Sequence, residues 1–153
     1  MPRTHEDIER FILNSNVPNE QVAAGTWVLR DPDWEGAQIV VQHTEPLVVY
    51  RCKLFDLPQM PVADEARLLR HLMRLNGTEM LQGAYALEDS AVVVVEVMQA
   101  ENLDENEFIA ALDSLSLAIT EHREAVMALL PHGGQHAEAP GAVAKAGSAP
   151  AAA

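Results

Sequence analysis

The stretch at positions 68–87 constrains the fold most, because a helical pattern stops there and a strand pattern starts. Its first part places apolar side chains at helical spacing, at Leu68, Leu69, Leu72, Met73 and Leu75. Asn76 and Gly77 follow, and glycine favours a helix end because it has no Cβ to oppose a left-handed backbone. Residues 83–87 then lead into the valine-rich run at 91–98. The stretch therefore predicts an amphipathic helix joined to a β-hairpin.

Three strand patterns precede this joint, at residues 26–30, 37–43 and 47–54. All three are rich in β-branched or other apolar side chains, which favour strands. In the third, apolar positions alternate with Arg51 and Lys53, so this strand should have one buried face and one face partly exposed to water.

Helical patterns open and close the chain. Thr4 stands three positions before Asp7, which predicts an N-cap for a first helix over residues 4–15. Asp64 is expected to cap the middle helix in the same way. Asp104 has the capping-box spacing to Glu107, which predicts a long final helix over about 104–130.

Together these patterns predict one α+β domain at residues 1–130, with the order α-β-β-β-α-β-β-α and a five-stranded antiparallel sheet packed by helices. The valine run at 92–95 indicates a central strand that is buried on both faces or meets another subunit with its outer face. Residues 131–153 are rich in Ala, Gly and Pro. We expect them to form a disordered tail, because they cannot bury enough apolar surface to offset the entropy of ordering.

The net charge of −13 argues against nucleic acid as a partner, because phosphate contacts need clustered Lys and Arg. No apolar run is long enough to cross a bilayer, and the first residues lack the pattern of a secretory signal. Cys52 is the only cysteine, so no internal disulfide can form. We expect a cytoplasmic, acidic protein that binds neither nucleic acid nor membranes.

No residue pattern predicts catalysis, a metal site or a cofactor. Glycine-rich phosphate-binding motifs are missing from the sequence, and Cys52 is expected to be a small buried apolar residue. His132, His136 and Glu138 lie around a flexible Gly-Gly pair that fixes no ligand geometry. His122 falls on the apolar stripe of the final helix, where it is either a hydrogen-bonded residue at a core edge or dimer contact, or a titrating switch.

Several stretches of the chain resemble the YbjN-like family. They read GTWVL, TEPLVVYRCKL and LLRHLMRLNGTEMLQGAYALED, and they are followed by the capped final helix. This family is similar in fold to the type III secretion chaperones of the Tir-chaperone (CesT) type. The resemblance covers about residues 4–130. It implies a small acidic protein, commonly dimeric, that holds an extended segment of a client protein and brings no catalytic residues.

Two groups of residues are candidate contacts for a client or a second subunit. The first is a basic stripe in an acidic chain, formed by Arg67, Arg70 and Arg74. These side chains either pair with acids of the final helix, lie in solvent, or dock an acidic segment of a client or of the other subunit. The second group is apolar and could equally belong to the core. It consists of Val49 and Val94, expected on the outer sheet face, and Leu115 and Ile119 on the last helix.

The sequence therefore favours a non-enzymatic, chaperone-like module, expected to be a homodimer, that holds or regulates a client protein or peptide segment. The alternative is a ligand-sensing regulatory domain, of the sensory-transduction type ascribed to YbjN-like proteins, acting through a partner protein. Its ligand site would be a pocket lined by Trp27, Tyr50 and Tyr85. An enzyme is the third choice, because no catalytic motif is present.

Overall fold

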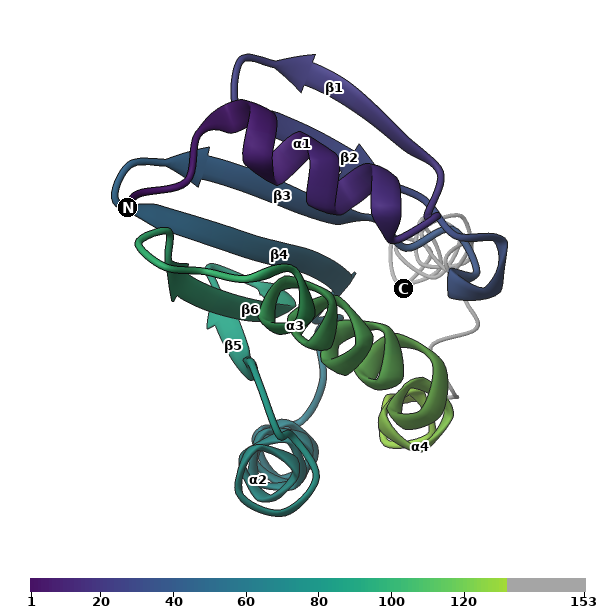
Figure 1. Cartoon of the computed structure of the whole chain (residues 1–153). Coiled ribbons are helices and arrows are strands. Elements are labelled where there is room, and N and C mark those ends of the chain that lie inside the picture. Colours follow the sequence, from purple (N-terminus) through teal and green to yellow (C-terminus); the bar gives the residue numbers. More distant parts are fainter. Residues whose placement is uncertain (132–153) are drawn as a thin grey trace, which may run out of the picture.

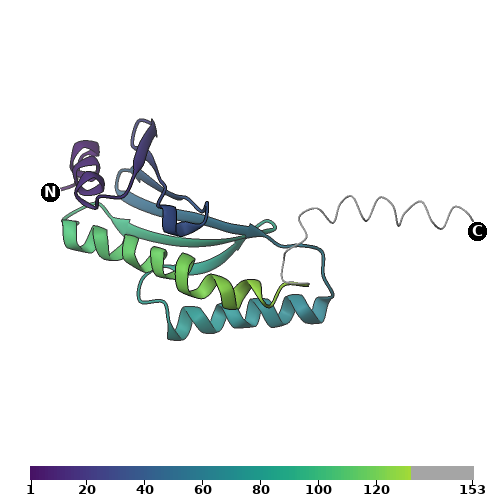
Figure 2. The ribbon, with the colours of Figure 1, turned by 90° about the vertical axis from the view of Figure 1, so that its right-hand side faces the viewer.

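The computed structural model describes residues 1–131, in which a six-stranded antiparallel sheet carries its helices on one face (Figures 1 and 2). The elements are α1 (His5–Asn14), β1 (Asn19–Ala23), β2 (Thr26–Leu29), η1 (Pro32–Trp34), β3 (Ile39–Thr44), β4 (Leu47–Asp56), α2 (Val62–Thr78), β5 (Ala84–Glu88), β6 (Ala91–Gln99), α3 (Glu105–Leu117), η2 (Ala118–His122) and α4 (Arg123–Met127). The strands lie in the order β1-β2-β3-β4-β6-β5. None of the helices within residues 1–131 is both long and apolar enough to cross a bilayer.

The α+β class and the helix-packed antiparallel sheet are confirmed, but the expected number of strands is wrong. The sheet has six strands because β1 folds back on β2 as an extra edge strand. All five β1 residues are exposed and show no apolar alternation, so the sequence pattern gave no strand signal there. The turn into β2 contains Gly25 at φ +70°, and a glycine just before a strand pattern was the available sign of a hairpin.

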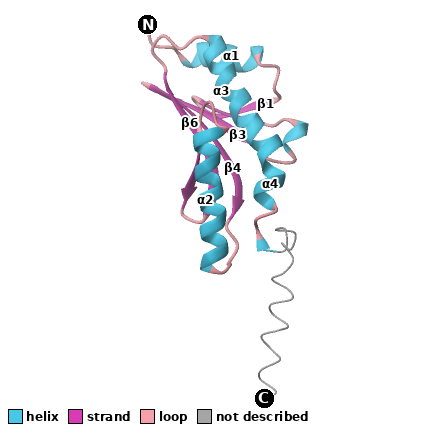
Figure 3. Ribbon diagram, turned by 90° about the horizontal axis from the view of Figure 1, so that it is seen from below, coloured by secondary structure: helices cyan, strands magenta, loops and turns pink. Residues whose placement is uncertain are grey.

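The inner face of the sheet holds the core. The strand register places Trp27 opposite Val41 and Val41 opposite Tyr50, and all three side chains are buried. Helices α1 and α3 cover this row, with ring contacts from Phe11 to Phe108 and from Phe108 to Tyr50. Helix α2 lies beside α4 on the same side of the sheet (Figure 3). The single core thus runs between one layer of helices and one face of the sheet.

No helix covers the outer face of the sheet within the described part of the chain (Figure 2). The valine run in β6 is nonetheless buried on both faces at residues 92–94, as expected for a strand inside the sheet. Val93 points outward and is fully buried between its cross-strand neighbours Lys53 and Ala86.

Two of the three helix starts follow the sequence expectation. Capping boxes form at Thr4 and at Asp104.

The prediction for the middle helix is wrong at both ends. Helix α2 has Pro61 at its N-cap without a side-chain cap, while Asp64 lies inside the first turn and pairs with Arg67 at 3.3 Å. A proline fixes its own backbone φ near the helical value, which favours a helix start at this position. The helix also continues through Gly77 to Thr78, and Met73, expected on the buried face, is 69% exposed.

The final helical segment is divided where one continuous α-helix was expected. Helix α3 passes into η2, a five-residue π-helical turn, and then into α4, which ends at Met127. Single π turns inside helices are uncommon and often lie near functional groups. Except for Pro131, the tail predicted at 131–153, with His132, His136 and Glu138, lies outside the described residues.

Candidate binding surfaces

One edge of the sheet, at β5, is closed at Tyr85 by a side chain of α2. Asn76, in the last turns of α2, donates from Nδ2 to the Tyr85 carbonyl at 3.1 Å and accepts from the Tyr85 N–H at 2.7 Å. Its amide thus imitates a neighbouring strand on the free side of β5. Two residues earlier, the Gly83 N–H donates to the Glu96 carboxylate. A second strand that pairs with β5 at Tyr85 would have to displace the Asn76 contacts.

The opposite edge, at β1, is open within residues 1–131. The Arg30 N–H donates to the Pro18 carbonyl at 2.9 Å, and the register continues with Glu20 opposite Val28. Since hydrogen-bonded and non-bonded pairs alternate in an antiparallel ladder, Asn19 and Gln21 point their N–H and C=O groups away from β2. No strand follows β1 in the sheet order. These outward groups form a template for main-chain pairing with another polypeptide.

The outer sheet face next to this edge is apolar at its centre. Val40, Val49 and Val95 are half-buried there, and Val97 is 49% exposed. A bidentate pair from Arg51 to Glu88, at 2.8 and 2.7 Å, crosses the same face. Val49 therefore lies on the outer face, as expected from the sequence.

Three other predicted contact residues are buried and expose no surface to a partner. Val94 points inward, opposite Cys52 and Tyr85, and is fully buried. The expectation that it lies on the outer face is wrong, because all residues around it are valines and give no alternation from which to read the face. Leu115 and Ile119 are also buried, in the layer between the final helices and the sheet. All three serve as core.

Helix α2 presents two distinct stripes to solvent. The first is apolar and consists of Val62, Ala66, Leu69 and Met73, all exposed except the half-buried Leu69. This set follows steps of four, three and four residues, which align side chains along one side of a helix. We call it the α2 apolar stripe. An exposed apolar stripe of this kind is typical of a surface that packs on another polypeptide.

The second stripe on α2 is the predicted basic one. Arg67 pairs with Asp64 of its own helix, whereas Arg70 and Arg74 have no ion-pair partner among residues 1–131. The expected pairs with acids of the final helix are therefore not seen in the described residues. Together with His71 and Leu129, the arginines line an open groove of about 480 Å³ between α2 and the end of α4.

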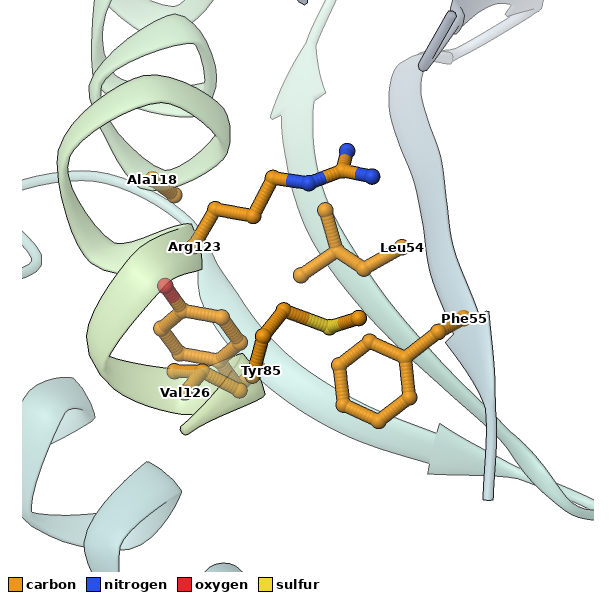
Figure 4. Close-up of a pocket in the computed structure, with 7 residues that line it drawn as sticks. Leu54, Phe55, Tyr85, Ala118, Arg123 and Val126 are labelled. Carbon is orange, nitrogen blue, oxygen red and sulfur yellow. The ribbon is translucent and has the colours of Figure 1, made fainter. Parts of the chain in front are cut away.

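The cavity at Tyr85 does not match the ligand pocket expected for the alternative function. Tyr85 lines a cavity of about 10 Å³ with Leu54, Phe55, Ala118, Arg123, Val126 and Met127 (Figure 4). This volume holds at most about one water molecule, and neither Trp27 nor Tyr50 lines the cavity. The Tyr85 hydroxyl lies 2.8 Å from His122 Nδ1, so His122 occupies the hydrogen-bonded position at the core edge that the sequence allowed.

The buried thiol is not arranged for nucleophilic chemistry. Cys52 is fully buried, and burial raises the pKa of its thiol to about 11. At neutral pH the sulfur therefore stays protonated and unreactive. Its role as a small apolar core residue fits this environment.

A pair of histidines that sequence reasoning did not single out joins α1 to the sheet. His5, the first residue of α1, places Nδ1 2.8 Å from Nδ1 of His43 in β3. The two are 38 positions apart in the chain, so no local spacing could indicate the contact. His43 is only 6% exposed, and burial together with the neighbouring His5 lowers its pKa.

Comparison with known proteins finds a matching chaperone family and two similar structures. The model of the type III chaperone family CesT_Tir_1 matches residues 1–131. The structure is similar to a chain of the heterodimeric ExoU–SpcU complex from the type III secretion system of Pseudomonas aeruginosa, with 17% identity, a TM-score of 0.56, and coverage of 80% of this chain and 97% of that one.

A second similar structure is YbjN from E. coli, described as a candidate transcription regulator. It shares 10% identity and a TM-score of 0.55, covering 78% of this chain and 90% of YbjN. No curated protein matches the sequence. The resemblance to YbjN-like proteins and to secretion chaperones is thus confirmed. At identities of 17% and 10%, the two structures show a shared fold alone.

Proposed function

Because this chain belongs to the CesT_Tir_1 family of type III chaperones, we propose that it is a non-enzymatic, chaperone-like module that holds an extended segment of a client protein. The observation that carries the proposal is the contrast between the two sheet edges. Asn76 closes the β5 edge at Tyr85, whereas β1 leaves the main-chain groups of Asn19 and Gln21 unpaired within residues 1–131. A client strand that adds to β1 gains main-chain hydrogen bonds irrespective of its side chains.

The similar structures are consistent with this proposal. ExoU–SpcU is a heterodimeric complex, so a chain of this fold is found bound to a different protein. The first three side chains of β1, from Asn19, Glu20 and Gln21, are polar and exposed, which limits self-association of an open edge through apolar contacts. A client segment would supply the apolar side chains, and the valines of the outer face lie on the neighbouring strands to receive them.

The experiment is co-expression of the chain with each protein encoded beside its gene, followed by size-exclusion chromatography with light scattering. We expect one of these proteins to form a stable complex and to aggregate when expressed alone. Thermal-shift screening with metabolites tests the ligand-sensing alternative in parallel. A metabolite that raises the melting temperature, with no complex formed, would contradict the chaperone proposal.

We further propose that the homodimer expected from the family resemblance forms through the α2 apolar stripe. Charges on α2 are polarised, with Asp64 and Glu65 in its first turn and Arg70 and Arg74 further along. An antiparallel pair of α2 helices would therefore set acids against arginines. Replacing Met73 with Arg should convert the dimer to a monomer in light scattering. Leu13→Arg, at a 59% exposed site on α1, is the matched control and should leave the mass unchanged.

The basic stripe gives a separate prediction. Since Arg70 and Arg74 have no ion-pair partner among residues 1–131 of an acidic chain, we propose that they dock an acidic segment of the client or of the second subunit. The double change Arg70→Glu and Arg74→Glu should weaken that complex about tenfold, because two attractive contacts become repulsive. Changing Arg10 and Lys53 to Glu alters the net charge equally and serves as control. Equal binding by both double variants would remove the role of the stripe.

A further inference from the structure

Three segments meet at the histidine pair that holds the start of α1. The ring centroids of His5 and His43 lie 4.7 Å apart at an interplanar angle of 87°, in an edge-to-face arrangement. The Gly25 carbonyl, in the turn of the β1–β2 hairpin, accepts a hydrogen bond from the backbone N–H of His43 at 2.7 Å. A Cβ on Gly25 would lie 2.6 Å from His5 Cε1, so the ring of His5 rests directly on that turn. The contact therefore joins α1, β3 and the hairpin that carries the open edge.

The surroundings of His43 fix which nitrogen carries its proton. Its Nε2 is buried and has no hydrogen-bond partner in the described residues. A buried N–H without an acceptor costs more than a bare ring nitrogen, because the unpaired donor loses its hydrogen bonds to water. We therefore assign the neutral tautomer with the proton on Nδ1. His43 then donates to Nδ1 of His5, and His5 carries its own proton on Nε2.

This arrangement has no favourable position for one more proton. If the proton joins His5 at Nδ1, two N–H groups face each other across 2.8 Å. If His43 takes it at Nε2, a buried cation with an unpaired donor results. Asp7 of α1 and Glu45 of the β3–β4 turn act in the opposite sense, by favouring the charged ring of His43, but burial and His5 outweigh them and lower its pKa. Arg3, which lines the same cavity as both rings, adds a further positive charge.

We propose that the His5–His43 pair is an acid-sensitive latch, which holds α1 and the β1–β2 turn together while both rings are neutral and releases them when a further proton is taken up. The cavity of about 510 Å³ beside the pair, lined also by Arg3, Thr4 and Glu45, gives protons and water access to the His5 side. The direction in which pH changes the stability of the docked state follows from the linkage between protonation and folding. Because the pKa of His43 in the folded chain is lower than its ordinary value of 6.5, the docked state loses stability as the pH falls below about that value.

The latch regulates the same surface that is proposed to hold the client, and this consequence rests on the proposed function. The turn that His5 contacts connects β1 to β2, its partner strand. Release of α1 would loosen that hairpin and the edge it presents. A client strand bound along β1 should therefore dissociate faster at acidic pH than at neutral pH.

Hydrogen exchange on the full-length chain tests the latch without any client. Backbone protection of α1, corrected for intrinsic rates, is compared between pH 7.5 and pH 5.0, with β4 and β6 as internal references. We expect α1 protection to fall about tenfold or more relative to the reference strands at the lower pH. In His5→Asn, whose side chain stays neutral and can accept at the position of Nδ1, this fall should be clearly smaller, because only the burial of His43 then opposes protonation. His122→Asn, at the unrelated Tyr85 contact, should retain it.

Equal α1 protection at both pH values in the natural chain, or an undiminished fall in His5→Asn, would overturn the latch. Nitrogen-15 NMR of the imidazole rings gives a second measurement that needs no variant. It should show His43 protonated at Nδ1 at pH 7.5, and a proton on Nε2 would refute the assignment. Client dissociation is measured separately at both pH values. A pH-dependent α1 in a chain that binds no client would contradict the proposed function and leave the latch standing.

Discussion

Replacing Asn76 with alanine should lower the free energy of unfolding by about 2–3 kcal/mol. The change removes the donor to the Tyr85 carbonyl and the acceptor from the Tyr85 N–H. Tyr85 is only 6% exposed, so water reaches these two main-chain groups poorly, and each group left unpaired costs about 1–3 kcal/mol. The alanine itself is a good helix former and offsets a few tenths of a kcal/mol. Urea unfolding followed by circular dichroism measures the difference.

Asn14→Ala is the matched control for this prediction. Asn14 makes an exposed hydrogen bond to Glu105 at 2.9 Å, and its loss should cost under about 0.5 kcal/mol. A similarly small effect at Asn76 would mean that the β5 edge is satisfied by water and that the side chain is not what closes it. The contrast between the two sheet edges would then no longer support the proposed function.

The chemistry of Asn76 also shows where sequence reasoning succeeded and where it stopped. The stretch around Asn76 carries the resemblance to the family, and a helix leading into a hairpin was predicted there. The structure shows that the helix does not end at Gly77. Asn76 instead reaches across to Tyr85, nine residues on. A helix end can be predicted from local residues, but a side chain that pairs with a strand depends on how the two elements pack.

Features that depend on residues close together in the sequence were predicted best. The capping boxes at Thr4 and Asp104 depend on residues three positions apart, and both form. Strand β4 was recognised because Tyr50 and Cys52 alternate with charged neighbours, and its register is then fixed by the one-sided burial. Strand β1 was missed because its pairing is imposed by the Gly25 turn and not by apolar periodicity.

The same physical reason explains which candidate contact residues could be placed from the sequence and which could not. The arginine stripe lies on the surface because charged side chains avoid the core, so Arg70 and Arg74 could be placed from the sequence. Val94 could not, since a run of valines carries no information on which face each one occupies. The histidine latch joins residues that are distant in sequence, and only the packed structure brings them together.

Gln21→Pro should abolish or strongly weaken client binding while leaving the fold intact. Gln21 belongs to a non-hydrogen-bonded pair with Trp27, so its N–H points away from β2 into solvent. Proline is tolerated on an edge strand at such a position, because no ladder hydrogen bond is lost. A client strand on the β1 edge would lose that donor and meet the proline ring. We expect affinity to fall about 10- to 100-fold, corresponding to 1–3 kcal/mol for an unpaired main-chain group.

Two further variants separate an edge effect from a general loss of β1. Gln21→Thr keeps the outward N–H and should bind the client as the natural chain does. Glu20→Pro removes the inward N–H of a pair bonded to Val28, so it should also weaken binding but with a measurable loss of stability. Binding is measured by titration calorimetry with the client identified by co-expression, and stability by urea unfolding of each variant. If Gln21→Pro binds the client with unchanged affinity, the segment does not add to β1, and the client surface must be sought on the outer valine face or on α2.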